Sequence, residues 1–364
     1  MANVNSEFLT MLDVMTQGKE RVASNIVDLT RQMNPIVEDA PAIACNKGKY
    51  HETTIKTGLP TVTWAKIYKG VPTSKARYQS ITHTTGEVES AVEVDRRVID
   101  DVANYTEFAA MSGGKKKSAV GARKVQVFEN EQISHAEAMT QEVARALFYE
   151  NQTTNPERIT GLSAFFNDPA SGAEGASQIL TPEGNPGMGM QHTSMWYCTW
   201  HPQTGHLIYP SGESSKGGFS SGKVEKEFSF DEDGHKYRVY RRDMRWKTGL
   251  VIRDFRYFGR IANINVQTLD KGKAINTALT GADLDDLMTE MHYRTFGRRM
   301  AKGKSCIYCN TTILMFLDYQ VRNSPKNLWL RMNETAQNGK EVLTHRMKPI
   351  KETDQLLNTE APIS

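Results

Sequence analysis

The pattern of hydrophobic and polar positions divides the chain into helical segments separated by stretches of strand character. A helix is predicted over residues 19–33, where apolar residues recur at helical spacing before Pro35. A second helical segment covers residues 94–111, and a long third one runs to about residue 150. The apolar stripe of the third segment comprises Val125, Phe128, Ala136, Met139, Val143 and Leu147. A helix of this length is expected to cross a whole domain.

Residues 46–92 have a different character, because they are rich in Thr, Val, Ile and Tyr and are punctuated by Gly and Pro. This composition predicts strands and turns, arranged as a long two-stranded excursion. An isolated hairpin is only marginally stable in water. We therefore expect the excursion to lie on a neighbouring subunit.

The second half of the chain is predicted to be mostly strand. The predicted strands are residues 194–201, 206–210, 223–230, 236–247 and 248–266. The first two are interpreted as a β pair around the turn at residues 202–205, and the last is expected to continue the sheet. Helices are predicted at residues 283–296 and 310–322.

Length and composition exclude several classes of protein. The 364 residues suffice for one large or two ordinary domains with a proper core. No window is apolar for long enough to span a membrane, and the first residues lack the features of a signal peptide, so a cytoplasmic product is expected. The net charge of +3 argues against a dedicated DNA-binding protein. Four cysteines are too few for a disulfide scaffold, and free thiols are expected.

The stretch FGRRMAKGKSCIYC, residues 296–309, contains both a Gly-Lys-Ser and a Cys-x-x-Cys. A phosphate-binding loop requires a glycine at the position of Arg298, and it lies between a strand and a helix rather than between a helix and a strand. Cys306 and Cys309 lack a second ligand pair, and in a strand they point to opposite faces. We interpret them as buried apolar residues.

Other candidate chemistry is weak. Cys198, His201 and His206 form the densest group of metal-ligand types, but a strand directs Cys198 and His201 to opposite faces. No catalytic residue, metal or cofactor is predicted. A metal- or thiol-dependent enzyme that uses this group or the Cys306–Cys309 pair remains an alternative.

A basic strand interleaved with aromatic residues suggests a further alternative. Its basic residues are Arg238, Arg241, Arg242, Arg245 and Lys247. Basic residues beside stacking aromatics can hold nucleic acid, which leaves a nucleic-acid-binding module as a second alternative. An amphipathic sheet with solvated arginines explains the same pattern, and loose contact with a packaged polyanion is the favoured role.

The order of these parts resembles the major capsid proteins of short-tailed, double-stranded DNA bacteriophages. The resemblance rests on VNSEFLTMLDVMTQ, TTIKTGLPTVTWAKIYKGVPTSKA, EVESAVEVDRRVID, ALFYENQTTNPERITGL, SMWYCTWHPQTGHLIYP, YRVYRRDMRWKTGLVIRDFRYFGRIANINV, CIYCNTTILMFLDYQ and MKPIKETDQLLNTEA. It implies an α+β fold of the Hong Kong 97 type. The implied divisions are an N-terminal arm (1–45), an extended β loop (46–92), a peripheral domain with a long spine helix (93–151), an axial domain with associated β hairpins (152–334) and a C-terminal return to the peripheral domain (335–364).

The resemblance also implies the function. The chain is expected to assemble with itself into pentamers and hexamers of an icosahedral shell that encloses double-stranded DNA in the virion. Further implied partners are a scaffolding protein, a portal and a cement protein, without any membrane. Contacts between subunits are expected at Trp64, Lys66, Ile67, Tyr68 and Lys69 of the extended loop, and the basic strand is the candidate DNA-facing surface. Crosslinking between subunits is not predicted.

Overall fold

The structure is a computed structural model, and it describes residues 34–101, 119–171, 175–182, 191–212, 217–266, 284–297, 303–323, 330–334 and 341–363. The predicted helix at residues 19–33 lies outside these residues. The described chain forms two compact units, which are treated separately. The first unit comprises Glu87–Glu142 and Gly218–Trp246, and the second comprises Met33–Gly86, Val143–Gly217 and Lys247–Ser364. The helix α4 and the strand β10 contribute residues to both.

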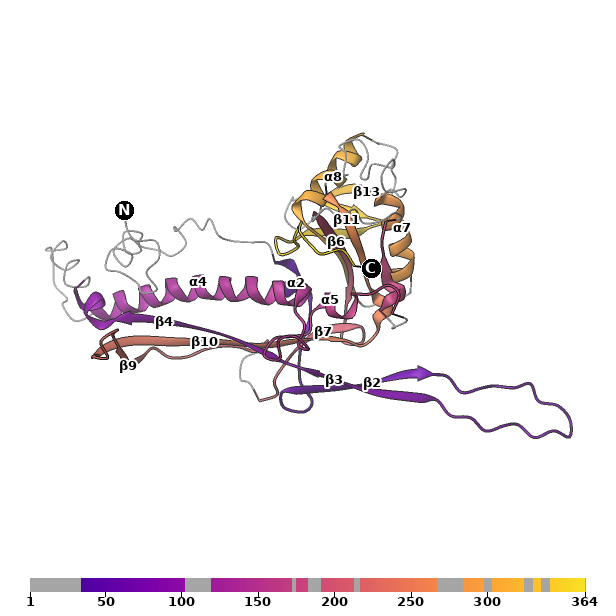
Figure 1. The fold of residues 1–364 in the computed structure, drawn as a ribbon, viewed down its shortest axis with the longest axis horizontal. Coiled ribbons are helices and arrows are strands. Elements are labelled where there is room, and N and C mark those ends of the chain that lie inside the picture. Colours follow the sequence, from indigo (N-terminus) through magenta and orange to yellow (C-terminus); the bar gives the residue numbers. More distant parts are fainter. Residues whose placement is uncertain are drawn as a thin grey trace. The chain divides into compact units, whose positions relative to one another are not determined.

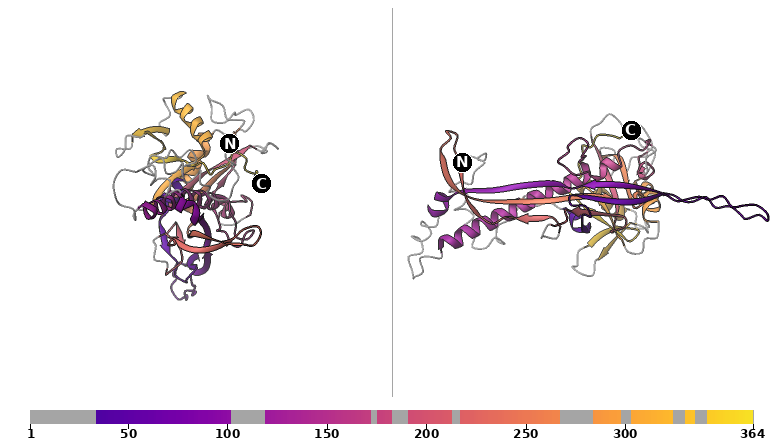
Figure 2. Two further views of the ribbon diagram at one scale, coloured as in Figure 1. Left: turned by 90° about the vertical axis from the view of Figure 1, so that its left-hand side faces the viewer. Right: turned by 90° about the horizontal axis from the view of Figure 1, so that it is seen from below.

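The first unit is built on the long helix α4 (Ala119–Tyr149) and the strands β4 (Gly86–Asp95), β8 (Phe219–Ser221), β9 (Glu225–Phe230) and β10 (Lys236–Ile252). β4, β8 and β9 all pair with β10. Phe128 and Met139 of α4 are buried against Val92 and Val94 of β4 and Met244 of β10. The helix lies along these strands in Figures 1 and 2. The long helix predicted from the sequence is confirmed, as is the β9–β10 hairpin.

The second unit contains a seven-stranded sheet in the order β13-β14-β15-β12-β6-β11-β5. Its strands are β5 (Ile179–Leu180), β6 (His192–Trp200), β11 (Phe258–Asn265), β12 (Lys304–Cys309), β13 (Leu330–Glu334), β14 (Glu341–His345) and β15 (Lys348–Glu352). Every residue of β6 is buried. The helices α7 (Leu284–Thr295) and α8 (Thr311–Asn323) share one apolar core with this sheet. Both helices are confirmed, as is the strand that contains Cys306 and Cys309.

A second group of strands in this unit connects to the extended loop. β1 (Ala42–Ala44) runs parallel to β7 (Gly205–Tyr209), which pairs with the end of β10. The short helices α2 (Pro35–Asp39) and α5 (Leu162–Phe165) and the 3-10 turns η2 (Ala176–Gln178) and η3 (Phe255–Tyr257) join these elements. β2 (Tyr50–Gly58) and β3 (Arg77–Thr84) form a separate two-stranded sheet.

Two strand predictions are wrong in their pairing. β6 and β7 were expected to form a pair, but only one isolated bridge, between His201 and Gly205, joins their ends. Both edges of β6 are already occupied by β11 and β12, so β7 has no free edge to join. Residues 248–266 were expected to continue one sheet. Instead, β10 ends at Ile252, and β11 begins at Phe258 in the other sheet, after the turn η3.

The predicted helix at residues 94–111 also begins later than expected. β4 extends to Asp95, and helical residues follow from 96 to 101, where the described segment ends. Val94 is 1% exposed and packs in the core of the first unit as a strand residue. Because strand and helical spacing coincide over a few residues, the apolar pattern alone could not locate this boundary.

Candidate subunit interface

The β2–β3 hairpin of the second unit is largely exposed to solvent. Its strands pair in antiparallel register from Tyr50 opposite Thr84 to Lys56 opposite Tyr78, with a one-residue irregularity before Gly58. Residues 59–76 beyond the strands form its tip. Figures 1 and 2 show the hairpin projecting away from the seven-stranded sheet and its helices. A hairpin of this length makes few contacts that stabilise it within one subunit.

Large apolar side chains are concentrated at the tip and exposed to solvent. Trp64 is 97% exposed, Ile67 is 86% exposed and Tyr68 is fully exposed. Leu59, Val62 and Val71 are exposed beside them. A cluster of exposed aromatic and aliphatic residues is typical of a protein interface, where Trp and Tyr contribute most of the binding energy.

Two hydrogen bonds define the conformation of the turn at the tip. The backbone N–H of Lys69 donates to the carbonyl of Lys66 at 3.1 Å, and the hydroxyl of Ser74 donates to the carbonyl of Thr61 at 2.8 Å. Tyr68 has a φ of 62°, a left-handed conformation that a bulky residue adopts at a cost. The turn therefore presents Ile67 and Tyr68 outward at the end of the hairpin.

The hairpin is also strongly cationic. Residues 53–86 contain no Asp or Glu, and they contain Lys56, Lys66, Lys69, Lys75 and Arg77. All five are exposed. A surface that carries only positive charge favours an acidic partner surface.

The basic strand lies in β10, and carboxylates of the first unit neutralise part of it. The Nε of Arg241 lies 2.9 Å from Oδ1 of Asp243, which raises the pKa of Arg241, and the Nε of Arg245 lies 2.9 Å from Oε1 of Glu89. Arg242 donates to the carbonyl of Gly222. The guanidinium of Arg238 lies 5.5 Å from the centre of the Phe228 ring. Within the described residues, carboxylates thus pair with Arg241 and Arg245 of this strand, whereas Arg242 contacts a backbone carbonyl and Arg238 an aromatic ring.

The cysteines have the properties of core residues. All four are buried free thiols. Cys309 packs in the apolar core beneath α7 and α8, whereas Cys306 lies across from Cys198 in β6 and beside Asp39. The two cysteines of the Cys-x-x-Cys stretch therefore lie on opposite faces of the sheet, as predicted. Burial, together with the charge of Asp39, raises the pKa of Cys306 to about 12.

The histidines of the alternative metal group lie in different surroundings. The Nδ1 of His201 accepts a hydrogen bond from the backbone N–H of Gln203, whereas His206 lies in β7 against His51 of the hairpin. Within the described ranges, no group of three or more His, Cys, Asp or Glu side chains is arranged to hold a metal ion. No helix in those ranges combines the length and apolar character that a membrane span requires.

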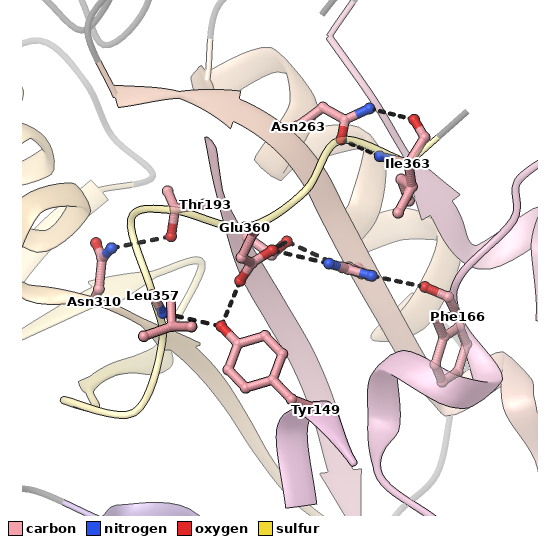
Figure 3. A network of polar contacts seen from close by, with 10 residues as sticks. Tyr149, Phe166, Thr193, Asn263, Asn310, Leu357, Glu360 and Ile363 are labelled. Atoms are coloured by element: carbon pink, nitrogen blue, oxygen red, sulfur yellow. Dashed lines mark hydrogen bonds and ion pairs between the residues drawn. The ribbon is translucent and has the colours of Figure 1, made fainter. Parts of the chain in front are cut away.

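A polar network that sequence reasoning missed fixes the C-terminal segment to the second unit (Figure 3). The Nη2 of Arg260 in β11 lies 2.9 Å from Oε2 of Glu360, and both side chains are 5% exposed. The Oε1 of Glu360 accepts from the hydroxyl of Tyr149, and Oε2 accepts from the hydroxyl of Ser194. Burial and the negative charge of Glu360 raise the pKa of Tyr149. The sequence signal for this pair is an arginine placed between Gly259 and Ile261 in a strand that is mostly buried.

A second buried centre ties α2 to the sheet. The Oδ1 of Asp39 lies 2.6 Å from the Nζ atoms of both Lys304 and Lys351, and its Oδ2 accepts from Tyr308 at 2.7 Å. Burial acts most strongly on this carboxyl and raises its pKa, but the hydrogen bonds from Lys304, Lys351 and Tyr308 together lower it below the usual value. Lys304 is the lysine of the Gly-Lys-Ser stretch, and it serves this ion pair.

Comparison with known proteins identifies the class to which this arrangement belongs. A chain in the cryo-EM structure of bacteriophage epsilon15 aligns with a TM-score of 0.67 and 27% identity, covering 100% of this chain and 99% of that chain. The capsid of bacteriophage JBD30 aligns with a TM-score of 0.46 and 10% identity, covering 97% of each chain. Comparison with curated protein sequences gave no significant match. The fold is that of phage capsid proteins of the Hong Kong 97 type, as the sequence resemblance implied.

The family follows from the sequence comparison. The family described as major capsid protein GP7 matches residues 17–364, and the chain belongs to this family. It is a major capsid protein of a tailed bacteriophage, and it assembles with copies of itself into the shell of the virion. The predictions of fold and function are confirmed. Neither the enzyme nor the nucleic-acid-binding alternative gains support from these comparisons.

Proposed function

We propose that the tip of the β2–β3 hairpin is a principal contact between subunits of the shell. The observation that carries this proposal is the exposure of Trp64, Ile67 and Tyr68 on a segment that leaves its own subunit. Burial of these side chains on a neighbouring copy would remove a large apolar area from water. Lys66 and Lys69 would flank the apolar contact and pair with acidic groups of the neighbour.

The assembly unit in this proposal is a ring of five or six copies. Each hairpin reaches the next subunit, so contacts close around the ring and repeat across the shell. Weak individual contacts then combine through multivalency into a stable particle. The expected divisions of this subunit are the arm (1–45), the extended loop (46–92), the peripheral domain (93–151), the axial domain (152–334) and the return segment (335–364). In the observed fold, the hairpin itself occupies residues 50–84, and β4 pairs with β10.

The proposed partners beyond the chain itself are a scaffolding protein, a portal, a cement protein and packaged double-stranded DNA. Synthesis takes place in the cytoplasm of the host bacterium, and the shell works without catalysis. Contact with DNA would be electrostatic and independent of sequence. Arg238 and Arg242 are better placed for it than Arg241 and Arg245, whose charges face Asp243 and Glu89.

A pair of substitutions tests the proposed interface. Trp64→Ala combined with Ile67→Ala removes two of the large exposed apolar side chains of the tip and leaves the core of the subunit intact. We expect the variant to lose shell formation in negative-stain electron microscopy, while its thermal unfolding stays within about 0.5 kcal/mol of the wild type, as for other surface substitutions.

The matched control is Met347→Ala, because Met347 is 86% exposed in the turn after β14 and outside the hairpin. This variant is expected to form shells as the wild type does. Normal shells from the Trp64 and Ile67 variant would show that the tip is not required for assembly.

A further inference from the structure

Three histidines meet beneath the root of the hairpin. His51 of β2 lies directly opposite His83 of β3 in the strand register. The ring of His51 packs edge-on against the ring of His206 of β7, with 5.5 Å between their centres. His83 is 7% exposed and His206 is 1% exposed, whereas His51 is half-buried. The rings therefore lie where the hairpin joins the rest of the second unit.

Several buried polar atoms of this cluster have no hydrogen-bond partner in the protein. Nδ1 of His51, Nε2 of His83 and both ring nitrogens of His206 are buried without a hydrogen bond to a protein group. The hydroxyl of Thr53, on the same face of β2, is also buried without one. Native proteins leave few buried polar atoms unpaired, because each costs about 1–3 kcal/mol of stability.

The charged groups around the cluster favour neutral histidines. Arg253, which follows β10, is close enough to lower the pKa of both His51 and His206. From α5, the neutral ring of Phe165 lies 6.3 Å from His83. Among the groups whose charges affect the three histidines, no carboxylate is found in the described parts of the chain.

The acidic side chains adjacent in sequence to His51 and Arg253 bind other groups. Glu52 follows His51 in β2, but its carboxylate binds Lys47 and accepts from the hydroxyl of Ser80 at 2.6 Å. Asp254 follows Arg253, and its carboxylate binds Arg256 at 2.6 Å. A proton taken up by the cluster would thus meet positive charge without a compensating negative one.

Beyond its root, the hairpin is not packed closely on the second unit. Open grooves of about 610 Å³ and about 450 Å³ lie beside β2, and Ile55 and Thr57 line both of them. The first groove also includes Arg253 and Phe255, and the second includes Phe165. The histidine cluster is therefore a buried contact between the hairpin strands and the rest of the unit, together with the hydrogen bond from the hydroxyl of Thr84 to Gln152.

We propose that His51, His83 and His206 form a proton-sensitive latch that holds the root of the β2–β3 hairpin in place at neutral pH and releases it in mild acid. The latch is a property of the single subunit. Its consequence for the shell, a change in the direction of the hairpin tip, rests on the function proposed above.

The direction of the effect follows from the histidine pKa values. Burial lowers the pKa of both His83 and His206 to about 4, from about 6.5 for an exposed imidazole. The released hairpin therefore binds more protons than the docked one between these values, and docking weakens as the pH falls. At about pH 5, each of the two histidines shifts the equilibrium toward release by about 30-fold.

Hydrogen–deuterium exchange of the full-length chain, read peptide by peptide, tests the latch. Amides in residues 50–58 and 77–84 are expected to lose at least about 100-fold in protection between about pH 7.5 and about pH 5, after correction for the intrinsic rate, because the shifts from the two histidines multiply and a released hairpin is only marginally stable. Protection in β6 is expected to stay unchanged. Equal protection of the hairpin at both pH values would overturn the proposal.

Substitutions assign the response to the cluster. His83→Phe and His206→Phe each remove a titrating ring, and each is expected to reduce the acid response by about 30-fold at about pH 5. His235→Phe is the control, since the side chain of His235 is 78% exposed in the β9–β10 turn, and its response should match the wild type. A full response in both cluster variants would overturn the proposal. If these variants do not fold, the histidine pKa values of the wild type, measured by NMR, decide: values near 6.5 for His83 and His206 would overturn it.

A second buried histidine pair provides an internal reference. His292 and His345 lie 5.9 Å apart in the second unit, and burial lowers the pKa of each to about 4. Acid loosening around β14 would come from this pair, whereas loosening confined to residues 50–58 and 77–84 identifies the latch. Failure of shell assembly leaves the exchange result unaffected, so the two proposals can fail separately.

Discussion

Arg260 and Glu360 form an ion pair across 100 residues of sequence, with 2.9 Å between Nη2 and Oε2 and only 5% of either side chain exposed. The same guanidinium donates to the hydroxyl of Ser194 and the carbonyl of Phe166. This pair joins the C-terminal segment to β11, β6 and the turn after α5 (Figure 3). Because all its polar groups are paired, it holds the segment in one position.

Loss of the carboxylate at this site is expected to be costly. Glu360→Gln leaves the Arg260 charge buried without its counter-charge, and we expect a loss of about 3 kcal/mol in the free energy of unfolding. Denaturant unfolding of the unassembled chain measures it. The control is Glu290→Gln, because the Glu290–Arg294 pair is half-exposed on α7 and should contribute less than about 0.5 kcal/mol. Equal losses in the two variants would contradict the assigned role of the buried pair.

Asp39 gives a pH-dependent prediction. The pKa of Asp39 is lower in the folded chain than in the unfolded chain, where it is about 3.9. The contribution of Asp39 to stability is therefore complete above about pH 3.9, and it is lost as the pH falls through the lower pKa of the folded state. Asp39→Asn should therefore destabilise the chain by about 2–4 kcal/mol near neutral pH. The difference from the wild type should shrink below about pH 4, as the wild-type carboxyl is protonated. Thermal unfolding across this range measures the difference, and a gap that stays constant with pH would contradict this reading.

The thiols are expected to be unreactive. Burial raises the pKa of all four cysteines, and the thiolate is the reactive form. Titration with a disulfide reagent should detect no rapidly reacting thiol in the native chain and four thiols after denaturation in guanidinium. A reactive pair in the native protein would revive the thiol-enzyme alternative.

The basic strand gives a prediction about DNA. Arg238→Gln with Arg242→Gln should weaken binding of the unassembled chain to duplex DNA equally for all sequences, and should reduce the slope of log affinity against log salt by about 2. Arg241→Gln with Arg245→Gln is the matched comparison. It should have the smaller effect, because those charges already face Asp243 and Glu89. The reverse order would contradict the assignment.

The sequence predicted the elements of the fold better than their arrangement. Apolar spacing located α4, α7 and α8, and turn residues located the β9–β10 hairpin, because these signals are local. The pairing of β6 with β11 and β12 was missed, since it depends on residues far apart in the chain. The Arg260–Glu360 pair was missed for the same reason. Trp64 and its neighbours are predicted contact residues because a long excursion is expected to lie on a neighbouring subunit, as the extended loop implied by the family resemblance does.

The histidine cluster shows what composition cannot reveal. His51 and His83 lie 32 positions apart in sequence, and only the register of β2 and β3 brings them opposite each other. By sequence spacing, His206 belongs to a candidate metal group with Cys198 and His201. Its contact with His51 instead places it at the root of the hairpin.

The most direct test of the central claim, that the hairpin tip binds a neighbouring subunit, is photo-crosslinking from position 64 in assembled shells. A photoreactive phenylalanine analogue replaces Trp64, and mass spectrometry identifies the crosslinked peptides in a mixture of isotopically light and heavy subunits. Contact between the tip and a neighbouring subunit predicts crosslinks that join light to heavy chains at one defined surface. Crosslinks confined to single chains, or none despite intact shells, would contradict it.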